Sequence, residues 1–523
     1  MPNYAAPGVY VEEIPSSEKV LTAAPTAVAA FVGFTETYPT DDPNDPDGMA
    51  PRLVTSWLQY EALFGGFAPG CVLPLSVYGY FANGGTIAYI CRIPNASPSG
   101  QPSRLALPAS DRALGTPLQV ESIDPDANIT VDISTDDQGT DAADGPSPFT
   151  LTVLLDGEPV EQFPSLTFGG DRDAKKVVNA TSKKIKVEVN LEKGANIKSQ
   201  LELMKPGAFP LQKADPVPVP VTGRQFAGSE SARTGISGLA VAEDVTMVIV
   251  PDLITACTKD DGSIDLNLWK AVQTSLISHC EQFGNRMAIL DAPPNMTPQQ
   301  IRDWRSDVAM YDSQYAVLYY PWIKIENPIG SNGNAEVFVP PSGHVAGVWA
   351  RTDDERGVWK APANDTIRGV LDLERTITQN EQGLLNPIGI NCIRPFGVRG
   401  IRIWGARTLS SDTDWRYINV RRLFNMIETT ILEGTQYAVF EPNDMNLWEG
   451  VKRTLTAFLR GLWSAGALFG QSADEAFYVK CDAETNPPES IDQGKLVVEV
   501  GIAPVKPAEF VIFRISQKKQ IAS

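Results

Sequence analysis

The sequence predicts a multidomain protein of mixed α+β and α/β class, with mixed sheets covered by helices, an inserted β-rich surface domain and an extended arm at each end. The chain has 523 residues, which is too long for a single hydrophobic core. Its 42 glycines and 41 prolines favour strands and turns over a helical bundle. Strand-like and helix-like periodicities also alternate along most of the chain, as they do in sheets covered by helices.

The first 94 residues predict an extended arm followed by a strand–helix–helix–strand unit. Residues 1–20 contain the alternating segment Val9–Ile14, which is too small to carry a core and is expected to join a sheet of its own chain or of a neighbour. Residues 25–35 predict a buried strand. Ser56 is expected to cap a helix that ends at Gly65, and a second helix and the strand Thr86–Ile93 complete the unit.

The composition changes at Pro94. Residues 95–229 are rich in Asp, Ser, Thr, Pro and Gly, and their strand-like runs show little helical periodicity. These residues are therefore expected to form a β-rich domain inserted at the surface of the host domain.

The α/β pattern resumes after the insertion. Buried strands are expected at Val245–Val250, Arg286–Leu290 and Tyr315–Pro321, with helices between them. This order suits a parallel or mixed sheet covered by helices. Residues 21–94 and 230–365 are together predicted to form a middle α/β domain.

The last part of the chain predicts an inner α+β domain over residues 366–502. Two amphipathic helices are expected, and Asn446 with Glu449 predicts a capping box for the second. Three short strands follow, at residues 477–481, 495–502 and 510–515. The last of these, Phe510–Ile515, lies in the linker and terminal segment 503–523, so it is free to pair with another molecule.

Charge and composition exclude several classes of function. The formal net charge of −19 argues against nucleic-acid binding, which needs a basic face. The six cysteines are scattered without a CxxC pair, so free thiols in a reducing cytoplasm are expected. The first residues do not resemble a signal peptide, and the apolar run 23–34 is too short to span a bilayer, so membrane insertion is not expected.

The sequence contains one candidate catalytic site, a pair of aspartates. Phosphate-loop, nucleophile-elbow and zinc-protease motifs are absent, so no catalytic, cofactor-binding or metal-binding residue is assigned. The two histidines, His279 and His344, are expected to be capping or packed side chains. Asp252 and Asp291 each follow a predicted strand, where an enzyme of the α/β class would place paired carboxylates, although both also suit a turn or a helix cap.

Arginine is concentrated in one stretch of this acidic chain. Such a cluster favours either contact with an acidic surface of another molecule or ion pairs within the chain, with Glu428, Asp412 and Asp414 as the candidate partners. The residues are Arg394, Arg399, Arg402, Arg407, Arg416, Arg421 and Arg422.

Several segments together resemble one family. The sequence is similar to tail sheath proteins of contractile phage tails and of related bacterial contractile injection systems, over residues 1–94 and about 230–516. The segments that carry the resemblance include YAAPGVYVEE, TAVAAFVGFTE, VTSWLQYEALFGGF, LPLSVYGYFANGG, ARTGISGLAVAEDVTMVIVPD, YAVLYYPWIKI, PPSGHVAGVWARTDDERGVWKAPAN, INCIRPFGVRGIRIWGARTLSSD and WRYINVRRLFNMIETTI. Residues 95–228 do not match.

The resemblance implies a structural protein without cofactors, not an enzyme. Subunits of this family stack as six-membered rings around an inner tube, and the sheath contracts from a metastable extended state to drive the tube through a target envelope. The implied partners are other copies of the chain, the inner tube protein, and baseplate and terminal cap proteins. The chain is expected to be synthesised in the bacterial cytoplasm and to become part of an assembled phage tail or tail-like injection particle.

The resemblance also implies which residues make the contacts between subunits. The N-terminal arm and the C-terminal strand would each add to a neighbour's C-terminal sheet, through Val9, Tyr10, Val11, Phe510, Val511, Ile512, Phe513 and Ile515. The second amphipathic helix is expected to face the inner tube, with Lys452, Arg453 and Arg460 as contact residues.

Two alternatives stay open at this point. An α/β-class enzyme using Asp252 and Asp291 would form a small discrete oligomer, whereas a sheath protein would form rings or long cylinders. A structural or adhesin protein that does not contract would assemble with only one length state. The sequence does not distinguish a phage tail from a bacteriocin-like tail or a cell-retained injection system.

Overall fold

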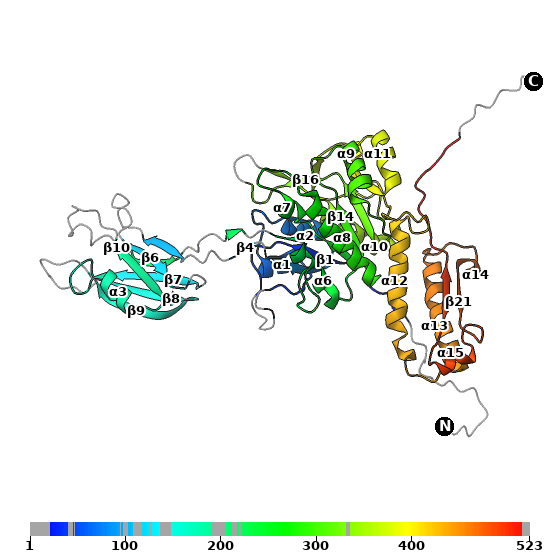
Figure 1. The fold of residues 1–523 in the computed structure, drawn as a ribbon, viewed down its shortest axis with the longest axis horizontal. Coiled ribbons are helices and arrows are strands. Elements are labelled where there is room, and N and C mark those ends of the chain that lie inside the picture. Colours follow the sequence, from blue (N-terminus) through cyan, green and yellow to red (C-terminus); the bar gives the residue numbers. More distant parts are fainter. Residues whose placement is uncertain are drawn as a thin grey trace, which may run out of the picture. The chain divides into compact units, whose positions relative to one another are not determined.

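The chain folds into two compact units, one of which is inserted into the other (Figure 1). The larger unit comprises the chain up to Ile93 and from Val221 onward, and the smaller comprises Pro94–Pro220. The computed structural model describes residues 21–39, 45, 48–94, 96–97, 103–107, 118–124, 127–135, 148–189, 205–211, 217–218, 221–330 and 335–514. The expected arm strand Val9–Ile14 and Ile515 lie outside these residues.

An eight-stranded mixed sheet forms the centre of the larger unit. Its six middle strands are parallel, and an antiparallel strand closes each edge. In spatial order the strands are β2 (Arg52–Val54), β3 (Ile87–Arg92), β1 (Val28–Gly33), β13 (Met247–Ile249), β14 (Met287–Asp291), β15 (Ala316–Tyr320), β19 (Ile390–Pro395) and β20 (Ile401–Ile403).

Helices cover both faces of this sheet, as continuous apolar strands require. Alternate residues of β1 enter two separate cores: Val32 packs with Trp269 of α8, and Phe31 packs with Trp349 of α10. The helices of this unit are α1 (Trp57–Phe64), α2 (Leu73–Ala82), α5 (Gly223–Ala227), α6 (Gly235–Gly238), α7 (Leu253–Cys257), α8 (Leu266–Phe283), α9 (Pro298–Asp303), α10 (Ser342–Arg356) and α11 (Gln379–Leu385). A small sheet of β16 (Ile323–Glu326), β17 (Glu336–Val339) and β18 (Val370–Leu373) accompanies them.

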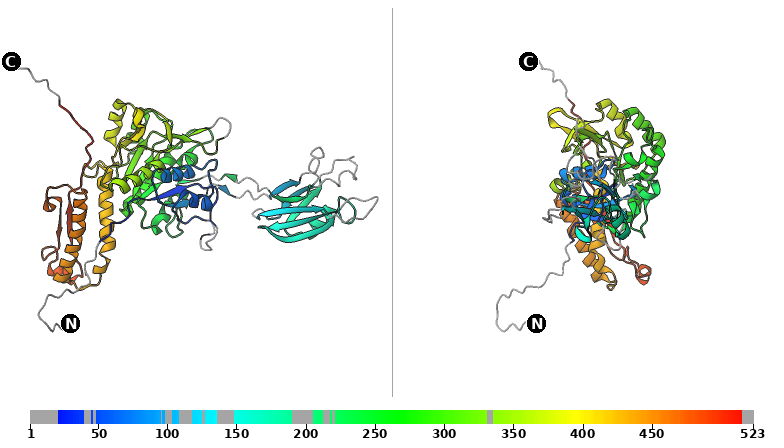
Figure 2. Two further views of the ribbon diagram at one scale, coloured as in Figure 1. Left: turned by 180° about the vertical axis from the view of Figure 1, so that it is seen from behind. Right: turned by 90° about the vertical axis from the view of Figure 1, so that its left-hand side faces the viewer.

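The C-terminal part of this unit consists of two long helices and a two-stranded sheet. Helices α12 (Ile418–Gly434) and α13 (Met445–Ser464) run alongside each other in Figures 1 and 2. Strand β21 (Phe477–Lys480) packs against α13 and pairs with the antiparallel strand β22 (Glu499–Ile502). The short helix α14 (Ala473–Ala476) precedes β21, and α15 (Pro488–Asp492) lies between the two strands in sequence. Leu423, Ile427, Leu459 and Phe477 share the core of this region.

The smaller unit has its own core between two antiparallel sheets. One sheet has the order β10–β6–β5 and the other the order β11–β7–β8–β9. Helix α3 (Ala174–Thr181) was not expected from the sequence. The strands are β4 (Ala96–Ser97), β5 (Arg104–Leu107), β6 (Leu118–Ser122), β7 (Ile129–Thr135), β8 (Phe149–Leu155), β9 (Glu158–Leu166), β10 (Ile185–Val189), β11 (Gly207–Pro210) and β12 (Val217–Pro218).

The mixed α+β class and the helix capped by Ser56 are confirmed, but several boundaries differ from expectation. Strands β19 and β20 lie in the range 366–502 assigned to a C-terminal domain, yet they complete the large sheet. Residues 221–229 were assigned to the insertion, yet Phe226 of α5 enters the core of the larger unit. Residues 510–514 form no strand within the described chain.

The expected capping box of α13 is wrong by two residues. Asp444 is the N-cap, and its carboxylate accepts a hydrogen bond from the backbone N–H of Leu447 at 2.9 Å. Asn446 lies inside the helix and donates its side-chain amide to Asp444. Asp and Asn are similarly good N-caps, so local sequence did not decide between them.

Candidate assembly surfaces

Residues 21–26, which lead into β1, lie antiparallel along α12. The side chain of Leu21 packs against Gly434. A Cβ atom at position 434 would lie 2.0 Å from the Cδ2 atom of Leu21, so this contact requires glycine. The N–H of Ala24 donates to the Thr430 hydroxyl at 2.9 Å, and Arg422 donates to the carbonyl of Thr26 at 3.0 Å. Leu21, where the described chain begins, therefore lies at the C-terminal end of α12.

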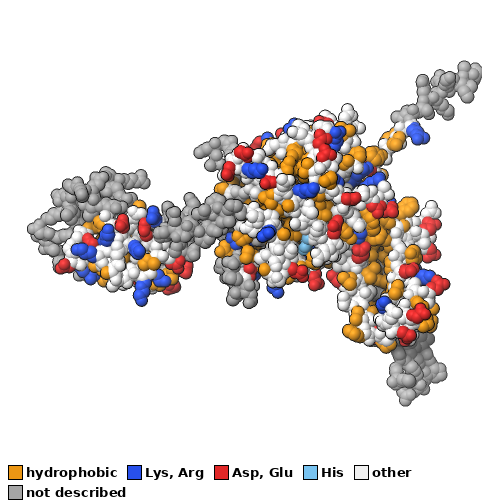
Figure 3. Space-filling model, viewed as in Figure 1, with side chains coloured by type: hydrophobic (Ala, Val, Ile, Leu, Met, Phe, Trp, Pro, Cys, Tyr) orange, Lys and Arg blue, Asp and Glu red, His pale blue; other side chains and the backbone are white. Residues whose placement is uncertain are grey.

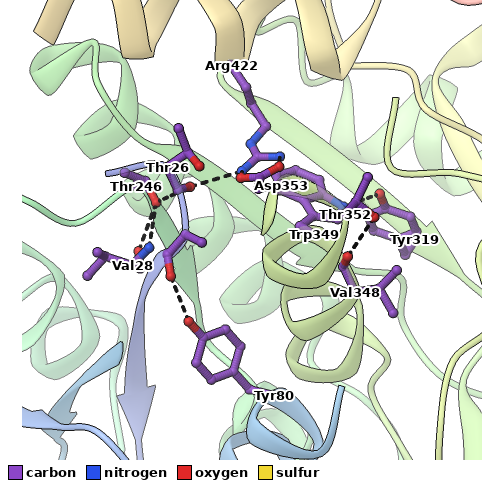
Figure 4. A network of polar contacts seen from close by, with 11 residues as sticks. Thr26, Val28, Tyr80, Thr246, Tyr319, Val348, Trp349, Thr352, Asp353 and Arg422 are labelled. Carbon is purple, nitrogen blue, oxygen red and sulfur yellow. Dashed lines mark hydrogen bonds and ion pairs between the residues drawn. The ribbon is translucent and has the colours of Figure 1, made fainter. Parts of the chain in front are cut away.

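A buried ion pair attaches α12 to the rest of the larger unit (Figure 4). Arg422 donates to both oxygens of Asp353, at 2.9 and 2.5 Å, and its guanidinium lies 4.6 Å from the ring centre of Trp349 on α10. The two charged side chains are only 3% and 5% exposed. Burial raises the pKa of Asp353 and the charge of Arg422 opposes that rise.

The same network continues into the sheet. The Thr246 hydroxyl donates to the carbonyl of Thr26 and accepts from the N–H of Val28, while Tyr80 on α2 donates to the carbonyl of Ala27. Polar contacts thus tie residues 26–28 to α2, α12 and the strand β13.

The C-terminal segment is fixed by a second cluster, around Glu509. Its carboxylate accepts hydrogen bonds from Arg407 at 2.6 and 2.9 Å, from Asn386 at 2.6 Å and from Tyr417 at 3.3 Å. Burial opposes ionisation of Glu509, but the hydrogen bonds from Arg407 and Asn386 outweigh it and lower its pKa. This cluster lies beside Tyr417, immediately before the N-terminal end of α12.

The residues after Glu509 carry apolar side chains into solvent. Phe510, Val511, Ile512 and Phe513 are between 68% and 83% exposed. Four consecutive exposed apolar residues with unpaired backbone groups are typical of a strand that pairs with another chain. The two terminal segments leave at opposite ends of α12, whose 17 residues span about 25 Å.

Helix α13 carries the residues that the sequence predicts to contact an inner tube. Val451, Leu455 and Leu459 face the core, whereas Arg453 and Arg460 are exposed and Lys452 is half-buried. Gly450 and Gly461 lie on the exposed side, where a Cβ would meet none of the described atoms within 4 Å. This helix face is therefore open to close approach, and the contact with a tube stays a prediction.

Three of the seven arginines in the arginine-rich stretch form ion pairs within the chain. Arg407 pairs with Glu509, Arg421 with Glu428, and Arg422 with Asp353. Arg421 also lies 4.3 Å from the ring centre of Trp415. Among the ion pairs of the described residues, Glu428 is the one candidate partner that pairs with an arginine, and Asp414 pairs with Lys506.

Asp252 and Asp291 each cap the start of a helix distant in sequence. Asp252 accepts the N–H groups of Phe34, Val72 and Leu73 at 2.6–3.2 Å, the last two at the beginning of α2. Asp291 accepts the N–H and hydroxyl of Ser342 at the beginning of α10. Both side chains are buried. Burial raises the pKa of each carboxyl group to about 7, although the hydrogen bonds that it accepts act to lower the pKa. Their hydrogen bonds give both a structural role.

The described residues offer little else for chemistry. His279 contacts Arg286 and His344 packs on Gly79, and burial lowers the pKa of each to about 4. No group of three or more potential metal ligands occurs among the residues that the structure describes. No helix in the same residues is long and apolar enough to cross a membrane.

Both described ends of the chain are therefore held near α12: Leu21 lies at the C-terminal end of this helix, and Glu509 lies beside Tyr417, just before its N-terminal end. Two family models match consecutive parts of the chain: the phage tail sheath protein central domain over residues 235–409 and the phage tail sheath C-terminal domain over residues 410–518. Together the matches cover more than half of the 523 residues, and the chain belongs to the contractile tail sheath protein family.

Individual relatives agree with the family models. A prophage major tail sheath protein of Pseudomonas aeruginosa (strain UCBPP-PA14) is 30% identical over 260 residues, which are 48% of this chain and 62% of that protein. A chain of the anti-feeding prophage helical sheath in its contracted state is 25% identical, with a TM-score of 0.57 over 98% of this chain and 100% of its own. A chain of the six-fold symmetrised anti-feeding prophage baseplate is 25% identical, with a TM-score of 0.56 over 99% of this chain and 100% of its own.

Proposed function

We propose that this chain is the structural subunit of a contractile sheath. It polymerises as stacked six-membered rings around an inner tube, and the sheath contracts from a metastable extended state to drive the tube through a target envelope. The observation that carries the proposal is the exposed apolar segment Phe510–Phe513 beyond the Glu509 cluster. The similarity to a sheath in its contracted state and to a six-fold symmetrised baseplate supports it.

Polymerisation proceeds by strand addition at both ends of the chain. Phe510–Ile515 pairs with a neighbour's sheet formed by β21 and β22, and the arm residues Val9, Tyr10 and Val11 pair with that of another neighbour. Each added strand contributes several backbone hydrogen bonds worth about 1 kcal/mol each, plus apolar burial. The Glu509 cluster and the contacts of residues 21–26 with α12 fix where these strands start.

Contraction is proposed to use two linkers that change conformation while the strand pairs between subunits stay formed. Residues 503–508 connect β22 to Glu509, and residues 15–20 precede the segment on α12. If subunits rotate about these linkers, the strand pairs persist while the packing between rings changes between two arrangements. A small free-energy difference per subunit then becomes large over the whole polymer, and a kinetic barrier holds the extended state.

Deletion of residues 1–14 is expected to abolish ordered sheath, because it removes one of the two strands that link each subunit to its neighbours. The purified full chain should form rings or long cylinders by negative-stain electron microscopy, and the truncated chain should not. Folding of the truncated chain is checked by its thermal midpoint. Sheaths of normal length from the truncation would exclude the arm as a joint, and a small discrete oligomer from the full chain would contradict the proposed function.

Reversing two charges on α13 is expected to separate the sheath from its tube. Arg453→Glu with Arg460→Glu should leave self-assembly intact but lower co-sedimentation with the inner tube protein by at least about tenfold. Each exposed ion pair contributes at most about 1 kcal/mol, but the contact repeats in every subunit. Arg104→Glu with Arg302→Glu, which reverses two exposed cations far from α13 in sequence, is the control. Equal co-sedimentation of both variants would contradict the contact.

The proposed sheath also ends on baseplate and cap proteins and belongs to a phage tail or tail-like particle. The similarity to a baseplate-associated chain supports the first partner. The smaller unit, Pro94–Pro220, joins the host through two neighbouring chain crossings and is proposed to be a surface domain.

A further inference from the structure

The turn between α12 and α13 presents an exposed apolar surface. Four large side chains there are between 59% and 103% exposed. They lie at the C-terminal end of α12, in the turn and at the first residue of α13, and they are Leu432, Val439, Phe440 and Met445. Hydrophobic side chains are exposed on this part of the molecule in Figure 3. We refer to these four residues as the apolar knob.

The backbone at the knob is strained in a way that exposes the largest side chain. Phe440 has a φ of +67°, a left-handed conformation that is unusual for a bulky residue. The conformation costs free energy, and the Phe440 ring is fully exposed to solvent, so burial of the ring does not offset that cost in the described part of the chain. Strain of this kind together with an exposed aromatic ring is typical of an anchor residue in an interface.

The rim of the knob is acidic. Glu433, Glu441 and Asp444 are exposed around it, and among the described residues Glu441 has no ion-pair partner. Two knobs would repel each other, so the knob does not pair with a second knob across a two-fold axis. Its partner must instead offer an apolar surface with basic side chains.

The turn between β19 and β20 has this complementary character. Val398 is fully exposed there, at 107%, beside the ring of Phe396. The guanidinium groups of Arg394 and Arg399 lie 5.5 and 5.0 Å from the centre of that ring. Arg399 is exposed and, within the part of the chain that the structure describes, has no carboxylate partner. We refer to Phe396, Val398 and Arg399 as the basic turn.

We propose that the apolar knob of one copy docks on the basic turn of a second copy. The knob follows the C-terminal end of α12, whereas the basic turn connects β19 to β20 at the edge of the large sheet, so the two surfaces belong to different elements. A contact between two different surfaces, repeated from copy to copy, builds a ring or a helix and not a closed dimer. The inference rests on the proposed function, because it requires a polymer.

The location of the knob supports a second copy as the occupant. Leu21, the first residue that the structure describes, lies against Gly434 at the same end of α12. If the arm joins a neighbour as proposed, that neighbour comes close to this end of the helix. The knob would add a side-chain contact to a joint otherwise made by backbone pairing.

The variant Phe440→Gly tests the apolar knob, because it should relieve the backbone strain at this position and at the same time remove the side chain that is proposed to bind the second copy. Phe440→Gly should raise the thermal midpoint of the chain by about 2 °C, because glycine adopts positive φ without strain. It should also raise the concentration needed for polymerisation at least about tenfold. Leu384→Ala, at an exposed leucine of α11 outside both surfaces, should change neither quantity. Polymerisation of Phe440→Gly at the wild-type concentration would overturn the proposal, whereas failure of the wild type to polymerise would overturn the proposed function.

Charge exchange and cross-linking identify the partner surface. Glu441→Arg and Arg399→Glu should each weaken polymerisation, and the double variant should restore it. All six native cysteines are buried, so a bismaleimide should link Phe440→Cys chains to Val398→Cys chains only in mixed polymers. Lack of rescue, or links from position 440 to the inner tube protein or to residues 1–20 of the same chain, would overturn the proposal.

Discussion

The double substitution Val511→Asp with Phe513→Asp is expected to stop the chain from polymerising while leaving its fold intact. Both side chains are exposed in the isolated chain, so neither substitution removes a contact of the folded unit. In an added strand, Val511, Phe513 and Ile515 point to one face, and all three are apolar. Burial of two carboxylates on that face would cost several kcal/mol per joint, more than the strand's backbone hydrogen bonds can offset.

The measurement combines assembly with stability. Sedimentation and electron microscopy should find only small species for Val511→Asp with Phe513→Asp, and the thermal midpoint should stay within about 1 °C of the wild type. Val241→Asp with Leu371→Asp, at two exposed apolar positions outside the segment, should polymerise normally. Because Glu509 is unchanged, the segment still leaves at the same place. Normal sheaths from the Val511 and Phe513 variant would show that this segment is not the joint.

Local periodicity predicted the helices of the C-terminal region well. Val420, Leu423 and Ile427 are buried on α12, and Val451, Leu455 and Leu459 on α13, as their spacing indicated. An amphipathic stripe specifies a helix within a few turns, without information from the rest of the chain. The sequence also predicted an apolar segment near the end of the chain that is free to pair with another molecule, and residues 510–513 are exposed and outside any strand of the described chain.

The contacts that fix the arms could not be predicted, because their partners are far apart in sequence. Glu509 contacts Arg407 across 102 positions, and Arg422 contacts Thr26 across 396. The arginine-rich stretch was a signal that ion pairs were needed, but the carboxylates that satisfy Arg407 and Arg422 lie outside it. Only the tertiary fold selects Asp353 and Glu509 over nearer acids such as Asp412 and Asp414.

Asp252 and Asp291 illustrate the same limit for the candidate chemistry. Their position after parallel strands is where carboxylates of an active site lie, and it is also where a carboxylate can cap a helix that begins nearby in space. The helices concerned start at residues 73 and 342, which no local pattern connects to Asp252 or Asp291. Sequence reasoning kept both alternatives, and the hydrogen bonds favour the capping role.

The apolar knob was missed for a different reason. Leu432, Val439 and Phe440 read as ordinary helix-end and loop residues, because exposure depends on how α12 and α13 pack. A possible signal was the presence of adjacent valine and phenylalanine in a turn next to Glu441 and Pro442, where turn residues are usually polar. The positive φ of Phe440 has no signature in the sequence, since phenylalanine is not a residue that favours it.

Replacing Arg422 with alanine is expected to lower the free energy of unfolding by about 3–5 kcal/mol, because it leaves the buried carboxylate of Asp353 without its counter-charge. The substitution also removes the hydrogen bond to Thr26 and the contact with Trp349, so α12 loses one of its contacts with residues 21–26 and its contact with the Trp349 ring on α10. Denaturant unfolding of the full chain measures the loss. Lys480→Ala, which breaks an exposed ion pair with Glu484, should cost less than about 1 kcal/mol.

The double variant Arg422→Met with Asp353→Leu distinguishes a missing counter-charge from lost packing. Apolar side chains of similar volume remove both buried charges, so much of the stability lost in Arg422→Ala should return. Polymerisation should not return to the same extent, because neither new side chain can donate to the carbonyl of Thr26 and hold the N-terminal segment on α12. Equal losses for Arg422→Ala and Lys480→Ala would contradict this role of the pair. Full recovery of both stability and polymerisation in the double variant would limit the pair to stability alone and leave the direction of the arm to other contacts, such as that of Ala24 with Thr430.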